Sequence, residues 1–451
     1  MAGQIKRLSK ARFDALSFSR RPSASWVSEP HEWFADKEET LIAVVLRDFI
    51  DDDWVYIVLG RDEAGLFRGI DQKVSLPTQK EARDELRKAI RRIKATGQVV
   101  FSQDTKPKKR QELFVPTVPP QRLHPYFVKV ASEDEFHSAR DILREIGYSY
   151  IDPDGNFVEQ FQTTGFNSRL WEIYLHAYLH EEEFWVSRDH PYPDYSCTKG
   201  ENIIHIEAVT VNKSENTGLV EPSPSNHEEV VERTLNYMPI KFGSALFSKL
   251  KRRYWESEHI RGQPLVFAIQ DFHQDQSMIW SATALPIYLY GYNHKWYHNE
   301  KGELVIVPEK LELHRHGEKE IPAGFFFQPD CENISAVIFS NSATIAKFNR
   351  MGKLAGFGNP KTTMVRMGAR HNPDPNAAFP LPFEVEVNPT KYSESWSEGL
   401  AMYHNPNALH PIDPELFPSI THHFFENGQL VSYGDEFHIY SSYTIVFLPK
   451  R

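Results

Sequence analysis

The sequence predicts a mixed α/β protein, α+β overall, in which helices and strands alternate through the middle of the chain. Stretches with helical hydrophobic spacing are separated there by short apolar runs rich in Val and Ile. In addition, 40% of the 451 residues are hydrophobic and 13% are aromatic, which is enough for well-packed cores. Because single cores rarely grow beyond about 250–300 residues, we expect two or three domains.

The first expected domain is an α+β module over residues 1–125. Two β-rich runs at 41–46 and 54–59 are separated by an Asp-rich turn, which predicts a hairpin. A helix should follow Thr78, whose hydroxyl can cap it together with Glu81, and Gly97 should end it. A Pro-rich stretch over 116–120 closes this module.

The second expected domain is an α/β core over residues 126–275. Ser132 and Glu135 predict a capping box that starts a helix ending at Gly147. The segments that should follow are a helix at 167–183, a strand at 203–209, a helix at 228–253 and a strand at 264–269. This order of elements favours a mixed sheet.

The third expected domain is a β-rich and loop-rich region over residues 276–451. Strands are expected near 304–307 and 336–339, and a helix from about Ser342 to Met351. The region either forms a domain of its own or adds strands to the core sheet.

Composition limits the functional class. No apolar run approaches the roughly 18 residues of a membrane span, and the N-terminus lacks the apolar segment of a secretory signal. Two cysteines cannot build a disulfide framework or a Cys-rich zinc site. We therefore expect a cytoplasmic protein. Neither a phosphate-binding P-loop nor a G-x-S-x-G hydrolase motif is present.

The formal charge of −10 argues against a protein that coats nucleic acid along its whole surface. Two local runs of basic residues nevertheless stand out, and each is either a solvated helix face or a set of phosphate contacts. The first run comprises Arg83, Arg87, Lys88, Arg91, Arg92, Lys94, Lys106, Lys108, Lys109 and Arg110, and the second comprises Lys241, Lys249, Lys251, Arg252 and Arg253.

Three acidic residues within a short segment are the candidate catalytic residues. Glu172 lies on the helix at 167–183, Asp194 lies in the turn "PYPD", and Glu207 lies inside an apolar strand. An unpaired buried carboxylate costs several kcal/mol, so Glu207 calls for a partner or an ion. Mg²⁺ prefers carboxylate oxygens, and phosphodiester hydrolysis uses such an ion to generate and orient hydroxide.

These residues resemble the motif of the restriction-endonuclease-like PD-(D/E)XK nuclease superfamily. The matching positions are Glu172, Pro193-Asp194 and Glu207, within residues 160–270. The resemblance implies a restriction-endonuclease-like core in which Asp194 and Glu207 bind Mg²⁺ or Mn²⁺ and Glu172 adds a direct or water-mediated ligand. It also implies DNA as the substrate. Members often cut duplex DNA as dimers, so a homodimer and a role in bacterial restriction or phage defence are further expectations by analogy.

The chain departs from that motif at one position. The lysine that should follow Glu207 by two residues is replaced by Val209. Such a lysine positions the attacking water and offsets charge in the transition state. The next helix offers Lys249, which is one helical turn from two apolar positions and should lean toward the sheet. We therefore expect Lys249 to serve as the fourth catalytic residue.

Other interpretations compete with this one. Glu172 could pair with Arg169 or His176, Asp194 could only shape a turn, and His205 could be a hydrogen-bonded core residue. Glu172, His176 and His180 share one helical face, which would suit a zinc hydrolase. A catalytically inactive nuclease fold that binds nucleic acid or a partner protein is the main alternative to a metal-dependent nuclease.

Overall fold

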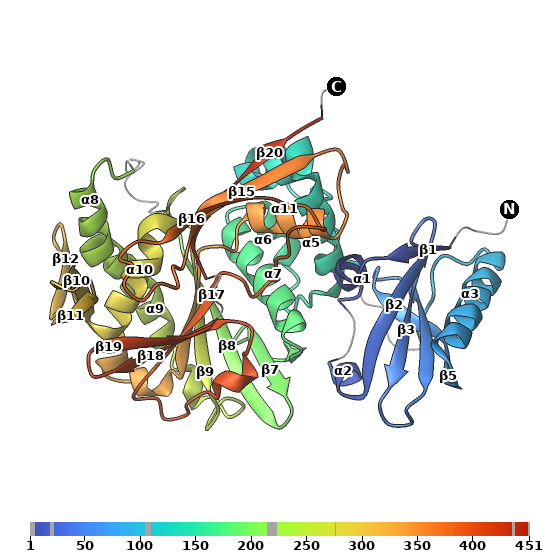
Figure 1. Ribbon diagram of the computed structural model, residues 1–451, viewed down its shortest axis with the longest axis horizontal. Coiled ribbons are helices and arrows are strands. Elements are labelled where there is room, and N and C mark those ends of the chain that lie inside the picture. The colour runs from blue at the N-terminus through green and yellow to red at the C-terminus, as the bar shows by residue number, and fades with distance from the viewer. Residues whose placement is uncertain are drawn as a thin grey trace. The chain divides into compact units, whose positions relative to one another are not determined.

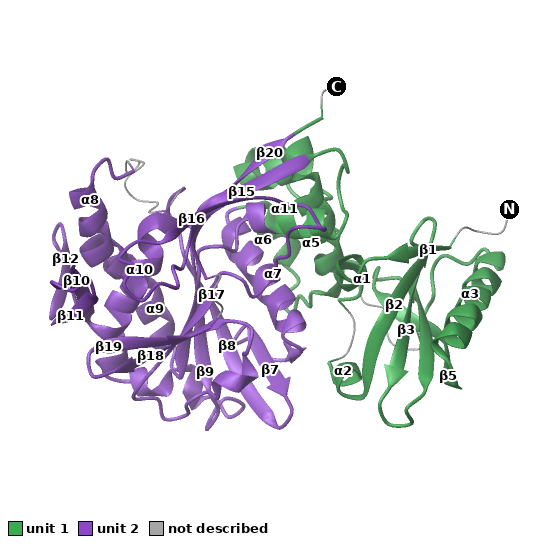
Figure 2. Cartoon of the chain, in the orientation of Figure 1, with its two compact units in different colours: residues 1–163, 348–362, 448–451 green, residues 164–347, 363–447 purple. Residues whose placement is uncertain are grey.

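The computed structural model describes residues 5–18, 22–103, 110–213, 223–275, 277–434 and 438–449. Its contacts divide the chain into two compact units. Unit 1 comprises residues 1–163, 348–362 and 448–451, and unit 2 comprises residues 164–347 and 363–447 (Figure 2). The predicted mixed α/β class is confirmed, because both units combine helices with β-sheet.

Unit 1 contains a five-stranded antiparallel sheet whose strands follow one another in chain order (Figure 1). The strands are β1 (Ile5–Leu8), β2 (Ser28–Asp36), β3 (Leu41–Asp48), β4 (Trp54–Arg61) and β5 (Phe67–Leu76). The expected hairpin is confirmed as β3 and β4, paired from Leu41↔Gly60 to Arg47↔Trp54. Helix α3 (Gln79–Ala95) packs its apolar face on this sheet.

The predicted start and end of α3 are also confirmed. The hydroxyl of Thr78 accepts a hydrogen bond from the backbone N–H of Glu81 at 3.2 Å. Gly97 follows the helix with φ of +72°, a conformation that favours glycine. The remaining helices of the first 163 residues are α1 (Lys10–Leu16), α2 (Ser23–Val27), α4 (Pro125–Ser132), α5 (His137–Ser149) and α6 (Phe157–Gln162). Helix α11 (Ile345–Leu354) starts near the predicted Ser342 and lies mostly in unit 1.

The capping box predicted at Ser132 is wrong. Ser132 is the last residue of α4, and its hydroxyl donates to the carbonyl of Val128 instead of capping a new helix. Helix α4 forms because His124 caps it and Pro125 occupies its first turn. The expected second helix begins only at His137, as α5, and its apolar residues Ala139, Leu143 and Ile146 are buried.

Unit 2 is built on an eight-stranded mixed sheet with the order β19-β18-β17-β14-β9-β8-β7-β6. Strands β8, β9 and β14 are parallel, whereas β7 pairs antiparallel with β8. The strands are β6 (Trp185–Ser187), β7 (Tyr195–Lys199), β8 (Asn202–Val211), β9 (Leu265–Asp271), β14 (Ala336–Ser340), β17 (Leu400–His404), β18 (Thr421–Glu426) and β19 (Gln429–Tyr433). Four strands of the expected C-terminal region thus belong to the same sheet as β8 and β9.

Helices cover both faces of this sheet. On one face, α9 (Met238–Leu250) and α10 (Met278–Tyr290) form a core with alternate residues of the strands, such as Val209, Phe267 and Val337. Helix α8 (His227–Glu232) leads into α9 through a π-helical turn over residues 233–237. On the other face, α7 (Phe166–Glu181) is fixed by a hydrogen bond from Trp171 Nε1 to the carbonyl of Ala268, at 2.9 Å.

Helix α10 was not predicted within the β-rich and loop-rich region over residues 276–451. Its sequence, MIWSATALPIYLY, is apolar on nearly every side and contains Pro286, so it shows no helical periodicity. The other strands of unit 2 form smaller sheets: β10 (Tyr292–His298) with β11 (Leu304–Lys310), β12 (Leu313–His316) with β13 (Lys319–Pro322), and β15 (Thr363–Arg370) between β16 (Leu381–Glu386) and β20 (Ile439–Phe447). None of the described helices has the length and apolar character needed to cross a membrane.

Candidate active site

Glu207 lies in the middle of β8, surrounded by the apolar core of unit 2. The β-branched residues of this strand favour an extended conformation, and β7 and β9 pair with it on either side. Side chains alternate along a strand, so Glu207 points to the same face as Val209, toward α9. Its side chain is 5% exposed. A carboxylate in this setting must be paired, and three donors meet it.

Two of these donors come from α9 and the turn that follows it. Lys249 Nζ lies 2.5 Å from Glu207 Oε1. Arg253 adopts a left-handed conformation with φ of +50°, which turns the chain back toward the sheet after the helix. The hydroxyl of Tyr254 then donates to the same Oε1 at 2.6 Å, and Arg252 Nη1 donates to that hydroxyl at 3.2 Å.

Asp194 supplies the third donor and adds its own carboxylate. Its backbone N–H donates to Glu207 Oε2 at 3.2 Å. Its Oδ2 accepts the backbone N–H of Ala208 at 2.8 Å, just before the ladder between β7 and β8 begins. This contact satisfies a backbone donor of β8, so Asp194 has a structural role as well as carrying charge. The result is two adjoining carboxylates at the start of β7.

Glu172 reaches this region from α7, on the other face of the sheet. Arg169 Nη1 binds its Oε1 at 2.7 Å. Arg188, just after β6, places Nη2 3.4 Å from Glu172 Oε2 and 3.8 Å from Asp194 Oδ1. The Glu172 and Asp194 oxygens are therefore no farther apart than the sum of these distances, about 7 Å, a limit that leaves room for a water between Glu172 and an ion held by Asp194. Tyr195 also anchors α7 here, because its hydroxyl donates to the Glu172 carbonyl at 2.6 Å.

The site holds strongly perturbed acids. Burial, and next the negative charge of Asp194, raise the pKa of the Glu172 carboxyl to about 8. Burial, and next the charge of Glu207, raise the pKa of the Asp194 carboxyl to about 6. The basic side chains therefore do not fully offset the cost of three neighbouring negative charges. Perturbed acids of this kind are concentrated at functional sites.

The donor set fits a hard divalent cation in part. A carboxylate oxygen has two lone pairs, so Asp194 Oδ1 and Glu207 Oε2 keep acceptor capacity beyond their present contacts. Across the described ranges, however, no group of three His, Cys, Asp or Glu side chains is arranged to hold a metal ion as it stands. Arg188 lies between Glu172 and Asp194, so Glu172 suits a water-mediated ligand better than a direct one. Asp194 and Glu207 would be the direct ligands.

A group of histidines lies beside these carboxylates. His205 is buried on the same face of β8 as Glu207, and its Nδ1 is 3.0 Å from the hydroxyl of Ser196. Burial, and next the charge of His259, lower the pKa of His205 to about 4. His259 stacks on His190 with ring centres 3.9 Å apart. His205 thus fits the predicted alternative of a hydrogen-bonded core residue.

The zinc alternative gains no support from the geometry of α7. Burial, and next the charge of His180, lower the pKa of His176 to about 3. Neither histidine belongs to a three-residue metal-binding group within the described part of the chain. Glu172 instead pairs with Arg169, as one of the alternative interpretations expected.

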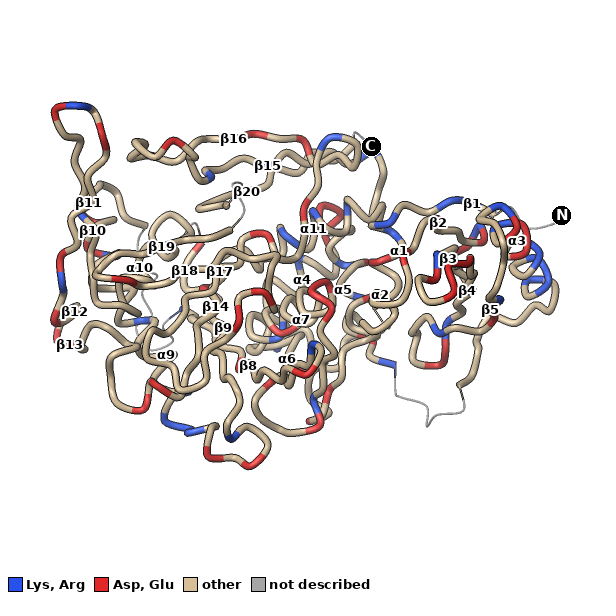
Figure 3. The backbone as a smooth tube through the Cα atoms, turned by 60° about the horizontal axis from the view of Figure 1, so that its bottom comes forward, with Lys and Arg blue, Asp and Glu red and all other residues tan. Residues whose placement is uncertain are grey.

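The two basic runs differ in their surroundings. On α3, basic and acidic residues lie close together (Figure 3). Several cations of this run have acidic partners within unit 1, as in Arg83–Glu32 and Lys94–Asp36. Lys106, Lys108 and Lys109 lie outside the described residues. The second run is closer to the carboxylates, because Lys249 and Arg252 belong to the site itself.

The structure brings together all four predicted site residues: Glu172, Asp194, Glu207 and Lys249. It also adds Arg188 and Tyr254, which the sequence interpretation missed. Arg188 follows a short edge strand and Tyr254 follows a left-handed turn, so neither has a periodic pattern that shows where its side chain points. In the sequence, only the polar run Arg252-Arg253-Tyr254 after α9 could have indicated that the chain turns back toward the carboxylates.

No protein-family model, curated protein or solved structure matches this chain.

Proposed function

We propose that this protein is a metal-dependent nuclease that hydrolyses phosphodiester bonds of nucleic acid, with DNA as the expected substrate. Asp194 and Glu207 bind Mg²⁺ or Mn²⁺, Glu172 contributes through a bound water, and Lys249 orients the attacking water. The observation that carries the proposal is the 2.5 Å contact between Lys249 Nζ and Glu207 Oε1. Helix α9 can therefore supply the positive charge that a lysine on the strand would have supplied.

The chemistry of each residue follows from its setting. Bound Mg²⁺ would supply a Lewis acid that lowers the pKa of its water and stabilises the leaving oxygen. Asp194 and Glu207 provide the hard oxygen donors that such an ion prefers. Lys249 supplies a positive charge beside these donors, where negative charge grows during attack on phosphorus. Arg252, which contacts Tyr254 at 3.2 Å, is well placed for a phosphate contact.

The second candidate function is a nuclease fold that binds nucleic acid or a partner protein without cutting it. One observation favours it: each of the three carboxylates already has a basic side chain beside it, and no three-residue metal group is formed among the described residues. Ion pairs of this kind can hold a fold together in the absence of any ion.

A cleavage assay separates the two functions. Plasmid DNA, single-stranded DNA and RNA are incubated with the full chain and Mg²⁺, Mn²⁺ or EDTA. The proposal expects cleavage that needs the metal and falls at least about a hundredfold in Glu207→Gln and Asp194→Asn. The matched control is Glu201→Gln, an exposed residue in the turn between β7 and β8, which should cleave like the wild type.

Metal binding is measured independently of activity by calorimetric titration of Mn²⁺. Wild type and Glu201→Gln should bind it, and Glu207→Gln should bind it at least about tenfold more weakly. Cleavage that persists in EDTA, or that is unchanged in Glu207→Gln, contradicts the proposal. Nucleic-acid binding without cleavage by any of the forms supports the second candidate. A homodimer and a role in restriction or phage defence belong to the same proposal, and the mass of the protein in solution tests the first of these.

A further inference from the structure

A group of aromatic rings lies beside the candidate active site, within unit 2. Tyr254, whose hydroxyl donates to Glu207, is buried. The ring of Tyr192 packs near it, with ring centres 5.9 Å apart, and Tyr192 is 44% exposed. Tyr192 also precedes Asp194 by two residues in the chain. An exposed aromatic ring is therefore a close neighbour of the carboxylates.

Two histidines extend this group of rings. His259 Nε2 lies 2.9 Å from the carbonyl oxygen of Tyr192, and the centres of the two rings are 6.0 Å apart. The His259 ring stacks on the ring of His190, with centres 3.9 Å apart and 14° between the planes. His190 is exposed. We call Tyr192, His190 and His259 the ring cluster. Its parts are joined by stacking and by a hydrogen bond, so its arrangement does not require a ligand.

The ring of Tyr192 is open to a further stacking partner. Its neighbours Tyr254 and His259 are inclined to it by 46° and 48°, so neither of them stacks on it. A nucleic-acid base that stacks on an aromatic side chain gains about five- to a hundredfold in affinity. In a duplex the bases are already paired and stacked on one another. The ring cluster therefore suits unpaired bases.

The charges of the adjoining segment suit the phosphates of such a strand. Residues 251–261, which include Tyr254 and His259, carry four basic and two acidic side chains. Arg253 is paired with an acid of this segment, Glu256, at 3.0 Å. Lys251, Arg252 and Arg261 are exposed, and none of them has an acidic partner among the described residues. This local excess of positive charge favours contact with a phosphate backbone.

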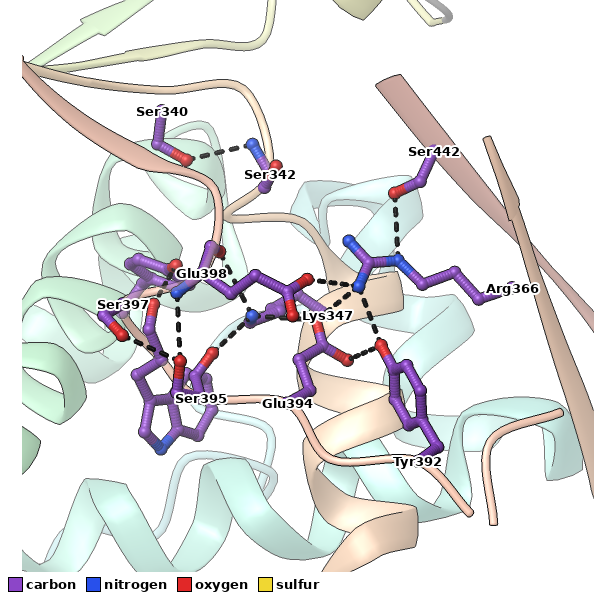
Figure 4. Close-up of polar contacts among 12 residues, drawn as sticks. Ser340, Ser342, Lys347, Arg366, Tyr392, Glu394, Ser395, Ser397, Glu398 and Ser442 are labelled. Carbon is purple, nitrogen blue, oxygen red and sulfur yellow. Dashed lines mark hydrogen bonds and ion pairs between the residues drawn. The ribbon is translucent and has the colours of Figure 1, made fainter. Parts of the chain in front are cut away.

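Other cations of unit 2 are not available in this way. Lys347 and Arg366 are fully buried, and both contact Glu394 Oε1, at 2.7 Å and 3.4 Å (Figure 4). Arg366 also pairs with Glu398. Two cations thus balance two carboxylates inside the unit, and this network leaves no excess charge for a phosphate.

We propose that the ring cluster binds unpaired bases of the substrate, so that the nucleic acid recognised beside the carboxylates is single-stranded. A base stacked on Tyr192 places the adjoining phosphate near Asp194, because the two residues are neighbours in the same turn. The inference rests on the proposed function for the cleavage step. Binding of the strand itself can be measured without cleavage.

Fluorescence anisotropy measures this binding with the full chain in EDTA, which prevents the proposed cleavage. We expect a labelled single-stranded DNA to bind at least about tenfold more tightly than the duplex of the same sequence. Tyr192→Ala should weaken binding of the single strand at least about fivefold, and Tyr192→Phe, which keeps the ring, should bind like the wild type. The matched control Tyr297→Ala removes an exposed ring on β10 and should also bind like the wild type.

Two further comparisons separate the contributions of rings and charge. His190→Ala removes another exposed ring of the cluster and should also weaken single-strand binding at least about fivefold. Lys251→Met should weaken it at least about threefold, because a phosphate contact is lost. Its control Lys301→Met changes an exposed lysine in the turn between β10 and β11 and should have no effect. Thermal unfolding confirms that each variant is folded. Calorimetric titration of Mn²⁺ should give the same affinity for Tyr192→Ala as for the wild type.

The results distinguish failure of this inference from failure of the proposed function. Duplex binding as tight as single-strand binding, no binding of either DNA, or unchanged single-strand binding in either ring variant would overturn the inference, even if the protein cleaves DNA. Single-strand binding that depends on Tyr192, without cleavage in Mg²⁺ or Mn²⁺, would support the inference and contradict the nuclease proposal.

Discussion

Lys249 Nζ lies 2.5 Å from Glu207 Oε1, although the two residues are 42 positions apart and belong to different elements. The strand position that would carry this cation instead holds Val209, which is buried in the core with α9. A lysine supplied by the helix lets the strand keep an apolar residue there. The charge can be tested without disturbing that packing, because Lys249 is 22% exposed.

We expect Lys249→Met to lower metal-dependent cleavage at least about a hundredfold, because the charge that stabilises the transition state is lost. Lys249→Arg should retain part of the activity, since it keeps the charge but changes the geometry. Cleavage rates at saturating Mg²⁺ measure both, with Lys301→Met as the control. If Lys249→Met cleaves at the wild-type rate, this lysine has no catalytic role.

The raised pKa values predict how stability depends on pH. Glu172 and Asp194 have pKa values of about 8 and about 6 in the folded protein, above their ordinary values, so the folded state holds protons that the unfolded state has released. Their contribution to stability is therefore present at acidic pH and is lost as pH rises from about 4 to 8. Urea unfolding across this range should show a shallower fall in Glu172→Gln than in the wild type. An identical slope would show that Glu172 titrates normally.

The same carboxylates couple metal binding to proton release. Because an ion is bound by ionised carboxylates, Mg²⁺ or Mn²⁺ should release protons from Asp194 and bind more tightly as pH rises toward 8. Mn²⁺ titrations at pH 6 and pH 8, each in two buffers of different ionisation enthalpy, measure the affinity and the protons released. An affinity that does not change with pH would contradict the assignment of Asp194 as a ligand.

Arg188 is expected to hold the carboxylates together when no ion is present. Arg188→Met should lower the free energy of unfolding at pH 8 by about 3 kcal/mol, because Glu172 and Asp194 lose part of the positive charge that compensates them in a buried setting. The loss should be smaller at pH 5, where Glu172 is protonated. Urea unfolding at both pH values measures this difference. Arg261→Met, which alters an exposed arginine, should have little effect at either.

Trp171 is expected to fix α7, and with it Glu172, on the sheet. Trp171→Phe removes a fully buried donor from the carbonyl of Ala268 and leaves a small cavity, so we expect a loss of about 2–4 kcal/mol. Trp185→Phe is the matched control, because Trp185 is 50% exposed on the edge strand β6. Denaturant midpoints of the two variants should differ clearly, and similar midpoints would show that Trp171 contributes little.

The elements that the sequence predicted correctly are those with a strong local signal. The cap at Thr78, the hairpin of β3 and β4, and the strands β8 and β9 follow from capping chemistry and from hydrophobic pattern. Helix α10 was missed because an apolar helix buried on most sides has no polar face to reveal its period. The boundary at Ser132 failed because its hydroxyl bonds the Val128 carbonyl within α4, a use of the serine side chain that sequence spacing does not distinguish from a cap.

The residues of the candidate site also divide into those that a local sequence pattern predicted and those that it did not. The carboxylates of Asp194 and Glu207 could be expected to meet, because each belongs to a strand or the turn before it. The position of Lys249 near the sheet was predicted from its spacing of one helical turn to apolar residues. Arg188 and Tyr254 depend on where irregular chain segments turn after β6 and α9, and sequence spacing carries no information about those directions.

The place of β9 in the large sheet has a practical consequence for truncated forms of the protein. All seven residues of β9 are buried, with β8 bonded on one side and β14, from residues 336–340, on the other. A polypeptide that stops near residue 275 would expose one edge of this apolar strand to other chains. We expect such a fragment to aggregate through that edge. The solubility of a fragment that contains the Glu207 strand therefore depends on β14, which is synthesised much later.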